Sequence, residues 1–190
     1  MNEISDTELK KVFPCRLPED MNQLARTTEQ ESPHDIEARI EAEKFRGKRW
    51  DEIDRALLKQ CYDISLMLSP RSFHYYFPAF IKHSQVDIEQ MALFVDTLLN
   101  LLADCGIHWP KALAQTEAVF LNDNPELKEM IEDIDVEKLS AWRKERWTLF
   151  SKQQWFLIHK WLCWIDKNSK YEIDRGVLGK AIENVELNLA

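Results

Sequence analysis

Residues 68–83 read LSPRSFHYYFPAFIKH, the densest aromatic run in the chain, with a helix-start signal at one end and a proline inside. Ser69 followed by Pro70 is typical of a helix N-terminus, because the serine hydroxyl can accept an unpaired amide and proline has no amide to leave unpaired. The large apolar residues that follow are Phe73, Tyr76, Phe77, Phe80 and Ile81. Their spacing of i, i+3, i+4, i+7 and i+8 predicts one apolar face of a helix.

Pro78 lies inside this predicted helix. A continuous helix needs the amide of residue 78 to bond the carbonyl of His74, and proline lacks that amide, so we expect a kink or a break here. Arg71 and Tyr75 should project opposite the aromatic face, with His74 at its flank. Two interpretations follow: a kink that exposes these three side chains for recognition, or a buried aromatic helix with a polar outer face. Aromatic stripes at helical spacing usually belong to the core, which favours the second interpretation.

Length and composition indicate a single helical domain. The 190 residues suffice for a substantial core, and 45% hydrophobic with 31% charged residues is typical of a soluble globular protein. Four glycines are too few for a turn-rich all-β fold or a glycine-rich phosphate loop. We expect an all-α, single-domain bundle of about seven or eight helices over residues 35–190. Residues 1–34, with three prolines among scattered charges, are predicted to form an extended or partly disordered arm.

Helical periodicity and capping signals place the other helices. We expect a first helix that begins at Ser32 and Pro33 and ends near Gly47. Further helices are predicted over residues 50–62, 86–105, 111–121, 126–134, 151–166 and 173–189. Residues 136–150 form a basic aromatic segment that we expect to face solvent. Ser151 is the predicted N-cap of the helix over residues 151–166.

The charge of the chain favours protein partners over nucleic acid or membranes. The net charge is −8, and both nucleic acid and anionic lipid attract positive surfaces. Residues 121–135 carry six acidic residues against Lys128, a local net charge of −5. The acidic residues predicted to form a partner surface are Asp123, Glu126, Glu129, Glu132 and Asp133. This segment is interpreted either as a docking surface for a basic protein or as a charged solvent face.

No motif in the sequence points to a metal, a cofactor or a catalytic group. The four cysteines are widely spaced without a CxxC pair, so we expect reduced thiols and a cytoplasmic location. Cys105 and His108 are three residues apart, but no HExxH or second Cys/His pair at zinc-finger spacing accompanies them, and GxSxG is absent. The N-terminus lacks a signal-peptide pattern, and the longest apolar run falls short of the ~20 residues that span a bilayer.

Two segments carry a family resemblance. Residues 46–53, RGKRWDEI, and residues 66–81, LMLSPRSFHYYFPAFI, resemble a family of small uncharacterised bacterial proteins. That family has a WxE segment and an F-L-(S/T)-P-x-x-F-x-Y-Y-L-P-A-F-L core. The resemblance covers roughly residues 45–165 and is most specific at the Tyr-Tyr-x-Pro core. The family has no established activity, ligand or catalytic residues, so the resemblance implies none here.

Two functions from different classes follow from these observations. The first is a cytoplasmic, non-enzymatic interaction protein, of the antitoxin or immunity-protein kind, that binds a basic partner. The alternative is a small-ligand-binding protein or enzyme with a pocket beside residues 70–83. Polar groups for that pocket would come from Trp50, Glu52, Arg71, His74 and Tyr75. Convergence of Glu52, Arg71 and His74 on one cavity would favour the alternative, and divergence into solvent would remove its basis.

Overall fold

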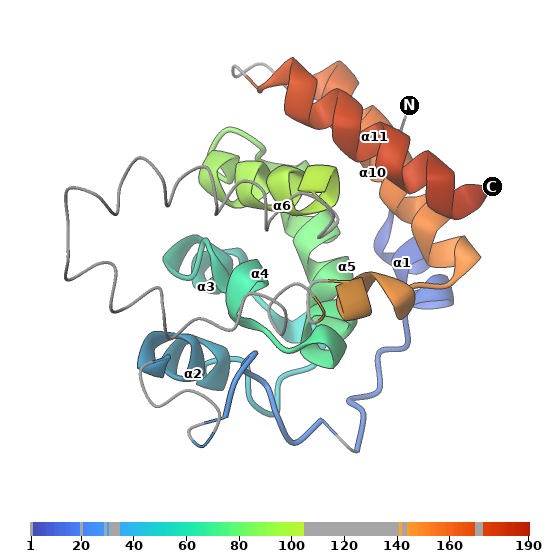
Figure 1. Ribbon diagram of the computed structural model, residues 1–190. Helices are drawn as coiled ribbons and strands as arrows, with labels where there is room; N and C mark the ends of the chain where they lie inside the picture. The colour runs from blue at the N-terminus through green and yellow to red at the C-terminus, as the bar shows by residue number, and fades with distance from the viewer. Residues whose placement is uncertain are drawn as a thin grey trace, which may run out of the picture.

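The computed structural model describes residues 2–19, 21–28, 30, 35–104, 141, 144–169 and 173–190. Within these ranges the regular structure is helical, apart from an isolated bridge between Ala25 and Leu68, which confirms the all-α prediction. The helices are α1 (Asp6–Val12), α2 (Ile36–Glu43), the 3₁₀ helix η1 (Trp50–Glu52), α3 (Arg55–Gln60), α4 (Ile64–Met67), α5 (Pro70–Val86), α6 (Ala92–Asp104), α10 (Lys152–Asn168) and α11 (Arg175–Leu189). Figure 1 shows α5 in the middle of this arrangement, with α6 above it and α10 to one side. None of the described helices is long and apolar enough to cross a membrane.

Helix α5 begins where the sequence predicts and continues through its proline. The Ser69 hydroxyl accepts a hydrogen bond from the amide of Ser72 at 3.3 Å, and Pro70 occupies the first turn. The helix then runs unbroken to Val86, so Pro78 does not split it. An interior proline costs about 3 kcal/mol. Burial of twelve of the seventeen residues of α5 offsets this cost.

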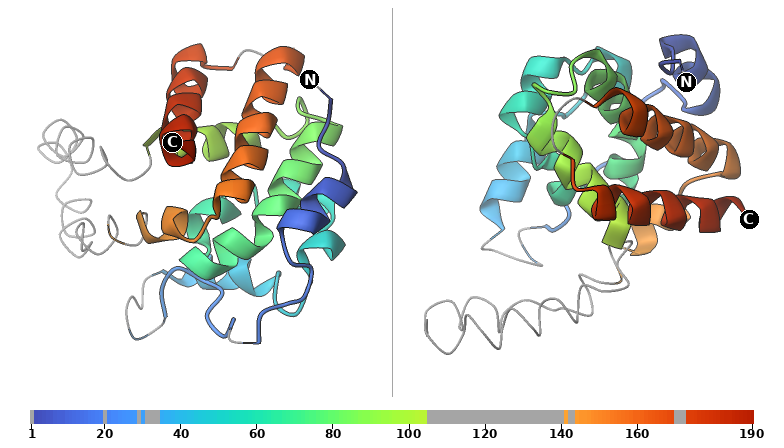
Figure 2. Two further views of the ribbon diagram at one scale, coloured as in Figure 1. Left: turned by 90° about the vertical axis from the view of Figure 1, so that its right-hand side faces the viewer. Right: turned by 90° about the horizontal axis from the view of Figure 1, so that it is seen from above.

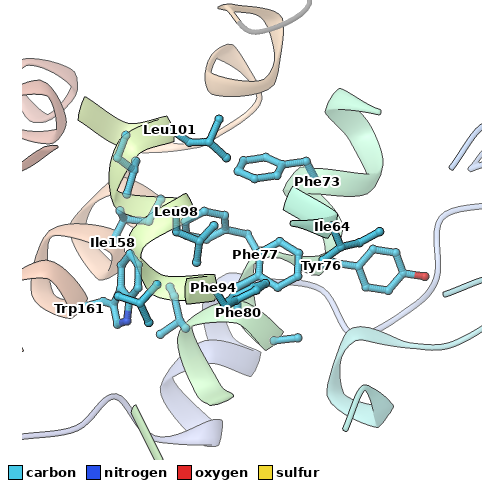
Figure 3. Close-up of a cluster of buried hydrophobic side chains, with 14 of the residues drawn as sticks. Ile64, Phe73, Tyr76, Phe77, Phe80, Phe94, Leu98, Leu101, Ile158 and Trp161 are labelled. Carbon is cyan, nitrogen blue, oxygen red and sulfur yellow. The ribbon is translucent and has the colours of Figure 1, made fainter. Parts of the chain in front are cut away.

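The aromatic face of α5 forms the centre of the core, as the second interpretation expected. Figure 3 shows phenylalanines of α5 directed toward α6 and α10. The rings of Phe73 and Phe77 meet edge to face with centroids 5.3 Å apart. Phe80 meets Phe94 of α6 at 5.2 Å, and Phe77 meets Trp161 of α10 at 6.3 Å. Such pairs stabilise a core by about 0.5–1.5 kcal/mol each beyond their buried area.

The two C-terminal helices close the other side of this core. Figure 2 shows α10 and α11 as an adjacent pair, and α11 also packs on α6. Asn184 of α11 donates hydrogen bonds to the carbonyls of Leu102 and Ala103 at 3.0 and 2.7 Å, which satisfies acceptors in the last turn of α6. Ser151 and Gln154 form a capping box at the start of α10, as predicted for Ser151.

Several predicted helix boundaries are wrong. Residues 50–62 form η1 and α3 instead of one helix, because Asp54 is extended and its carboxylate caps α3 by accepting the amide of Leu57 at 2.7 Å. Helix α6 begins at Ala92 rather than at residue 86, because α5 extends to Val86 and a turn follows. The predicted helices over residues 111–121 and 126–134 lie outside the described residues.

The described part of the N-terminal segment is ordered, contrary to the expectation of an extended arm. Helix α1 begins with a capping box in which Ser5 and Glu8 bond each other's backbone amides. Ile4, Leu9 and Phe13 are 4%, 0% and 2% exposed. The segment therefore contributes side chains to the core. Sequence periodicity missed it because α1 has only seven residues and a single buried one.

The basic aromatic segment before α10 also differs from the expectation of a solvent-facing helix. Arg146 is fully buried, with its guanidinium carbon 4.6 Å from the centre of the Phe73 ring. One of its nitrogens donates a hydrogen bond to the carbonyl of Ser65 at 3.1 Å. Trp147 is buried and meets Phe73 edge to face at 5.2 Å. The cation of Arg146 over the face of Phe73 is an attractive contact, and Trp147 adds an edge-to-face contact with the same ring. Both residues therefore belong to the core rather than to a solvent-facing surface.

Candidate functional site

Trp50 is a buried donor to another part of the chain. Its side chain is fully buried in η1, and its indole N–H donates to the carbonyl of Pro14 at 3.0 Å. Its backbone amide donates to the hydroxyl oxygen of Tyr75 at 3.4 Å. The polar atoms of Trp50 that could have met a ligand therefore bond the protein itself.

The adjacent tyrosines of α5 bind two different loops. Tyr75 is 6% exposed, and its hydroxyl donates to the carbonyl of Cys15 at 2.9 Å. The hydroxyl of Tyr76 lies 2.7 Å from the carbonyl oxygen of Phe45 and 3.0 Å from that of Lys48. Burial raises the pKa of both tyrosines. The expectation that Tyr75 lies on a polar outer face is wrong, because residues near the N-terminus cover that side of α5.

His74 belongs to a hydrogen-bonded chain that reaches α10. Its Nε2 lies 3.0 Å from Oε1 of Gln154, and that oxygen also accepts the amide of Ser151 at 2.9 Å. The amide nitrogen of Gln154 donates to the carbonyl of Val12 at 3.3 Å. Because an amide oxygen only accepts, His74 carries a hydrogen on Nε2. Burial lowers the pKa of His74, which keeps the ring neutral at pH 7.

Glu52 and Arg71 face solvent at separate places. Glu52 is exposed, and its carboxylate accepts the backbone amide of Arg49 at 2.9 Å, which caps η1. Arg71 is exposed in the first turn of α5. The five predicted ligand residues thus include two buried groups, one half-buried group and two exposed groups.

The buried polar groups instead converge on one short segment, residues 4–15, which we call the N-terminal strap. Gln154 of α10, Trp50 of η1 and Tyr75 of α5 donate to the carbonyls of residues 12, 14 and 15. Phe13 lies between these bonds, with its ring centroid 6.2 Å from that of His74 and 6.5 Å from that of Phe150. Figure 2 shows the start of the strap beside α5 and α10.

The other end of the strap is held by a buried glutamine and by ion pairs. Gln85, 5% exposed, accepts the amide of Ile4 at 2.8 Å and donates to the carbonyl of Ile4 at 3.2 Å. The ion pairs that join the strap to the body of the protein are Lys82–Asp6 at 2.9 Å, Lys160–Glu8 at 2.6 Å and Lys10–Asp51 at 2.9 Å. Partly exposed pairs such as Lys82–Asp6 and Lys160–Glu8 contribute about 0–1 kcal/mol each. Gln85 and the burial of Ile4 therefore carry more of the attachment than these two pairs do.

Two carboxylates at the strap have lowered pKa values. The hydrogen bond from Lys160 and those from Ser5 lower the pKa of Glu8 to about 2. For Asp51, burial alone would raise the pKa, but hydrogen bonds from Arg49 and Lys10 lower it overall. Both groups are thus ionised at pH 7 and keep their cationic partners in place.

Sequence reasoning missed Gln85 and Gln154, which contribute most of the amide bonds to the strap. A glutamine at a buried helix position has no distinguishing motif. Gln85 and Gln154 each form a hydrogen bond with a backbone group that lies more than 80 residues earlier in the sequence. The Ser151–Gln154 spacing was the only available signal, because a glutamine three residues after a serine is typical of a capping box.

Within the described part of the chain, Cys61 and Cys163 show no sign of activation for nucleophilic chemistry. Cys15, Cys61 and Cys163 are free thiols. Burial raises the pKa of Cys61 to about 12 and also raises that of Cys163. Cys163 lies 3.8 Å from Nε2 of His159, but the same nitrogen is 3.3 Å from a carboxylate oxygen of Glu186. An activated thiol needs a lowered pKa and a base that is oriented through its other nitrogen, and neither condition is met.

The remaining candidate features of the described chain lie away from α5. A cavity of about 270 Å³ lies between α6 and the start of α11. Its lining residues are Asp96, Leu99, Asn100, Ile173, Asp174 and Val177. Among the described residues, no group of three or more His, Cys, Asp or Glu side chains is arranged to hold a metal ion. The predicted acidic surface over residues 121–135, like Cys105 and His108, lies outside the described residues.

Comparisons with known proteins return no relative: no family model, no curated protein and no solved structure matches the chain. The resemblance of residues 45–165 to an uncharacterised bacterial family stays a prediction.

Proposed function

We propose that this protein is a non-enzymatic, cytoplasmic interaction protein that binds a basic protein partner. The observation that carries the proposal is the distribution of charge in the sequence. Of the net charge of −8, a net of −5 falls within residues 121–135. Clustered carboxylates steer a positively charged partner toward one place and discriminate against partners of the same sign. Inhibitors of the antitoxin and immunity-protein kind use this chemistry.

Three of the five groups that a ligand pocket beside α5 would use bond the protein itself. The polar atoms of Trp50 and Tyr75 bond backbone carbonyls of the strap, and His74 bonds Gln154. A ligand would have to break these bonds and leave the buried donors of Trp50 and Tyr75 without their protein partners, at about 1–3 kcal/mol each. The charged surface therefore remains the better basis for a function.

Affinity capture with charge-matched variants tests the proposal. The acidic-segment variant replaces Asp123, Glu126, Glu129, Glu132 and Asp133 by their amides. The control variant carries Glu→Gln at five exposed carboxylates of the described chain, namely Glu3, Glu37, Glu89, Glu145 and Glu183. Both variants change the net charge by the same amount, so a difference between them reports position and not total charge.

We expect the wild-type chain to capture one basic protein at a defined stoichiometry from native lysate. The acidic-segment variant should lose at least 90% of it, whereas the control variant should retain most. Because exposed charges are screened within about 10 Å at 0.1 M salt, capture should also weaken as salt rises. Equal capture by both variants would contradict the proposal, as would a small molecule that co-purifies stoichiometrically while no protein does.

A further inference from the structure

The C-terminal end of the strap, after helix α1, is bound in the way that other proteins bind extended peptides. The backbone at Phe13 is extended, with φ −113° and ψ 119°, and Pro14 follows it. The Phe13 side chain is an aromatic anchor that is 2% exposed. Donors from an indole, a phenol and a carboxamide reach three carbonyls of this stretch at 3.0, 2.9 and 3.3 Å. Aromatic grooves that recognise proline-containing peptides combine the same elements: an extended ligand, a buried side chain and donors to its carbonyls.

The contacts of the strap are made almost entirely with distant parts of the sequence. The bonds that join it to the body of the protein span from 36 residues, between Pro14 and Trp50, to 152 residues, between Glu8 and Lys160. The connection that follows the strap lies at the surface, with Arg16, Pro18 and Glu19 exposed. A strap from another molecule can therefore make the same contacts equally well. Binding within one chain and exchange between two chains differ only in the path of the exposed connection after the strap.

We propose that the strap groove, formed by Trp50, His74, Tyr75, Gln85 and Gln154, is a peptide-binding site that also accepts residues 4–15 of a second copy of this chain. Two copies then exchange straps reciprocally and keep every contact described above. The chain's own strap competes with the strap of a second copy for this groove, at an effective concentration of roughly millimolar. Exchange is thus favoured at high protein concentration and by any change that weakens the strap of the receiving chain. This interaction is independent of the acidic segment.

Fluorescence anisotropy with a labelled peptide tests the groove directly. The probe is residues 2–17, NEISDTELKKVFPCRL, with Cys15→Ser to prevent oxidation; serine is close in size to cysteine and keeps the carbonyl of residue 15 that Tyr75 binds. It is titrated with the full-length wild-type chain and with the full-length Phe13→Ala variant, whose own strap has lost its anchor. We expect the variant to bind one peptide per chain at least ten-fold more tightly than the wild type does.

Two controls make the result specific. A peptide that itself carries Phe13→Ala should bind at least ten-fold more weakly, and Tyr75→Phe added to the receiving chain should weaken binding of the intact peptide. Asp6→Asn with Glu8→Gln in the full-length chain weakens its own strap without opening a cavity and leaves both lysine partners free for the probe, so this pair replaces Phe13→Ala if that variant fails to fold. A folded, loosened chain that binds neither peptide, or both equally, overturns the proposal.

Native mass spectrometry tests the exchange between copies. An isotope-labelled Phe13→Ala chain and an unlabelled wild-type chain, both full-length, are concentrated together to about 1 mM and then diluted. Dimers that contain one chain of each kind should form. Excess strap peptide should convert these dimers to monomers. The absence of mixed dimers, or dimers that the peptide leaves intact, overturns the exchange.

Discussion

At the scale of single residues, the adjacent tyrosines of α5 show how a helix embedded in the core is joined to its surroundings. Successive side chains of a helix point about 100° apart, so Tyr75 and Tyr76 reach different loops. The hydroxyl of Tyr75 bonds the carbonyl of Cys15, and that of Tyr76 bonds the carbonyl of Phe45, which also accepts the amide of Lys48. The aromatic spacing of the sequence predicts the burial of Tyr76 but not that of Tyr75, because the cover over Tyr75 comes from residues 60 positions earlier.

Replacement of Tyr76 by phenylalanine should destabilise the protein while leaving its shape intact. The change removes the buried hydroxyl that bonds the carbonyls of Phe45 and Lys48, while the carbonyl of Phe45 keeps the amide of Lys48 as a donor. We expect a loss of about 1–3 kcal/mol in urea denaturation. Tyr62→Phe is the matched control, because Tyr62 is 48% exposed and should change stability by less than about 0.5 kcal/mol. Equal effects of the two changes would contradict the role of Tyr76.

The two half-buried histidines of α5 should make the protein less stable in mild acid. Burial lowers the pKa of both His74 and His83 below the ordinary value of 6.5, although the hydrogen bond to the carbonyl of Ile53 partly opposes this for His83. The unfolded chain therefore binds protons at a higher pH than the folded chain does. Stability is fully present above pH 6.5 and falls as the pH drops below it.

Urea denaturation at pH 7.5 and 5.5 measures this dependence. The double variant His74→Gln, His83→Gln should lose less stability between these two pH values than the wild type. The depressed carboxylate pKa values, such as that of Glu8, act only at lower pH and do not interfere. A wild-type chain that is as stable at pH 5.5 as at pH 7.5 would be inconsistent with neutral, buried histidines.

At the scale of helices, α10 connects the strap to α5 through one side chain. Gln154 completes the capping box of its own helix, accepts from His74 and donates to the carbonyl of Val12. The N-terminal signals Ser69–Pro70 and Ser151 predict the starts of α5 and α10 correctly, since a cap is a local interaction. Helix α1 carries the same kind of local signal in the Ser5–Glu8 spacing, but its seven residues show too little apolar periodicity to predict a helix, and its packing depends on partners such as Gln85 and Lys160 far along the chain.

Gln154→Ala should therefore lower the free energy of unfolding far more than the same change at the neighbouring Gln153. The substitution removes three hydrogen bonds at a buried position, and we expect a loss of about 2 kcal/mol. Gln153→Ala, at an exposed position in the same turn, should stay within about 0.5 kcal/mol of the wild type. Chemical denaturation of the two variants gives the comparison, and similar losses would show that Gln154 acts only through helix propensity.

At the scale of the whole molecule, the periodicity of the sequence predicts the all-α class, because one apolar face per helix is a local pattern. The arrangement of the helices and the location of the strap are not local. The same holds for the candidate site: Trp50, His74 and Tyr75 were identified as polar groups near one another, but their partners are carbonyls of residues 12–15 and a glutamine of α10. Sequence patterns identify hydrogen-bond donors but do not show which acceptor each donor bonds.

Hydrogen–deuterium exchange of the strap tests most directly whether the polar groups around α5 hold the N-terminus. The amides of Leu9 and Phe13 bond the carbonyls of Ser5 and Leu9 at 3.1 and 2.8 Å within α1. If the strap is part of the core, these amides open only with a sizeable fraction of the global unfolding free energy, and we expect protection factors above roughly 100 at pH 7. Exchange of both amides at the rate of an unstructured peptide, while α5 stays protected, would contradict it.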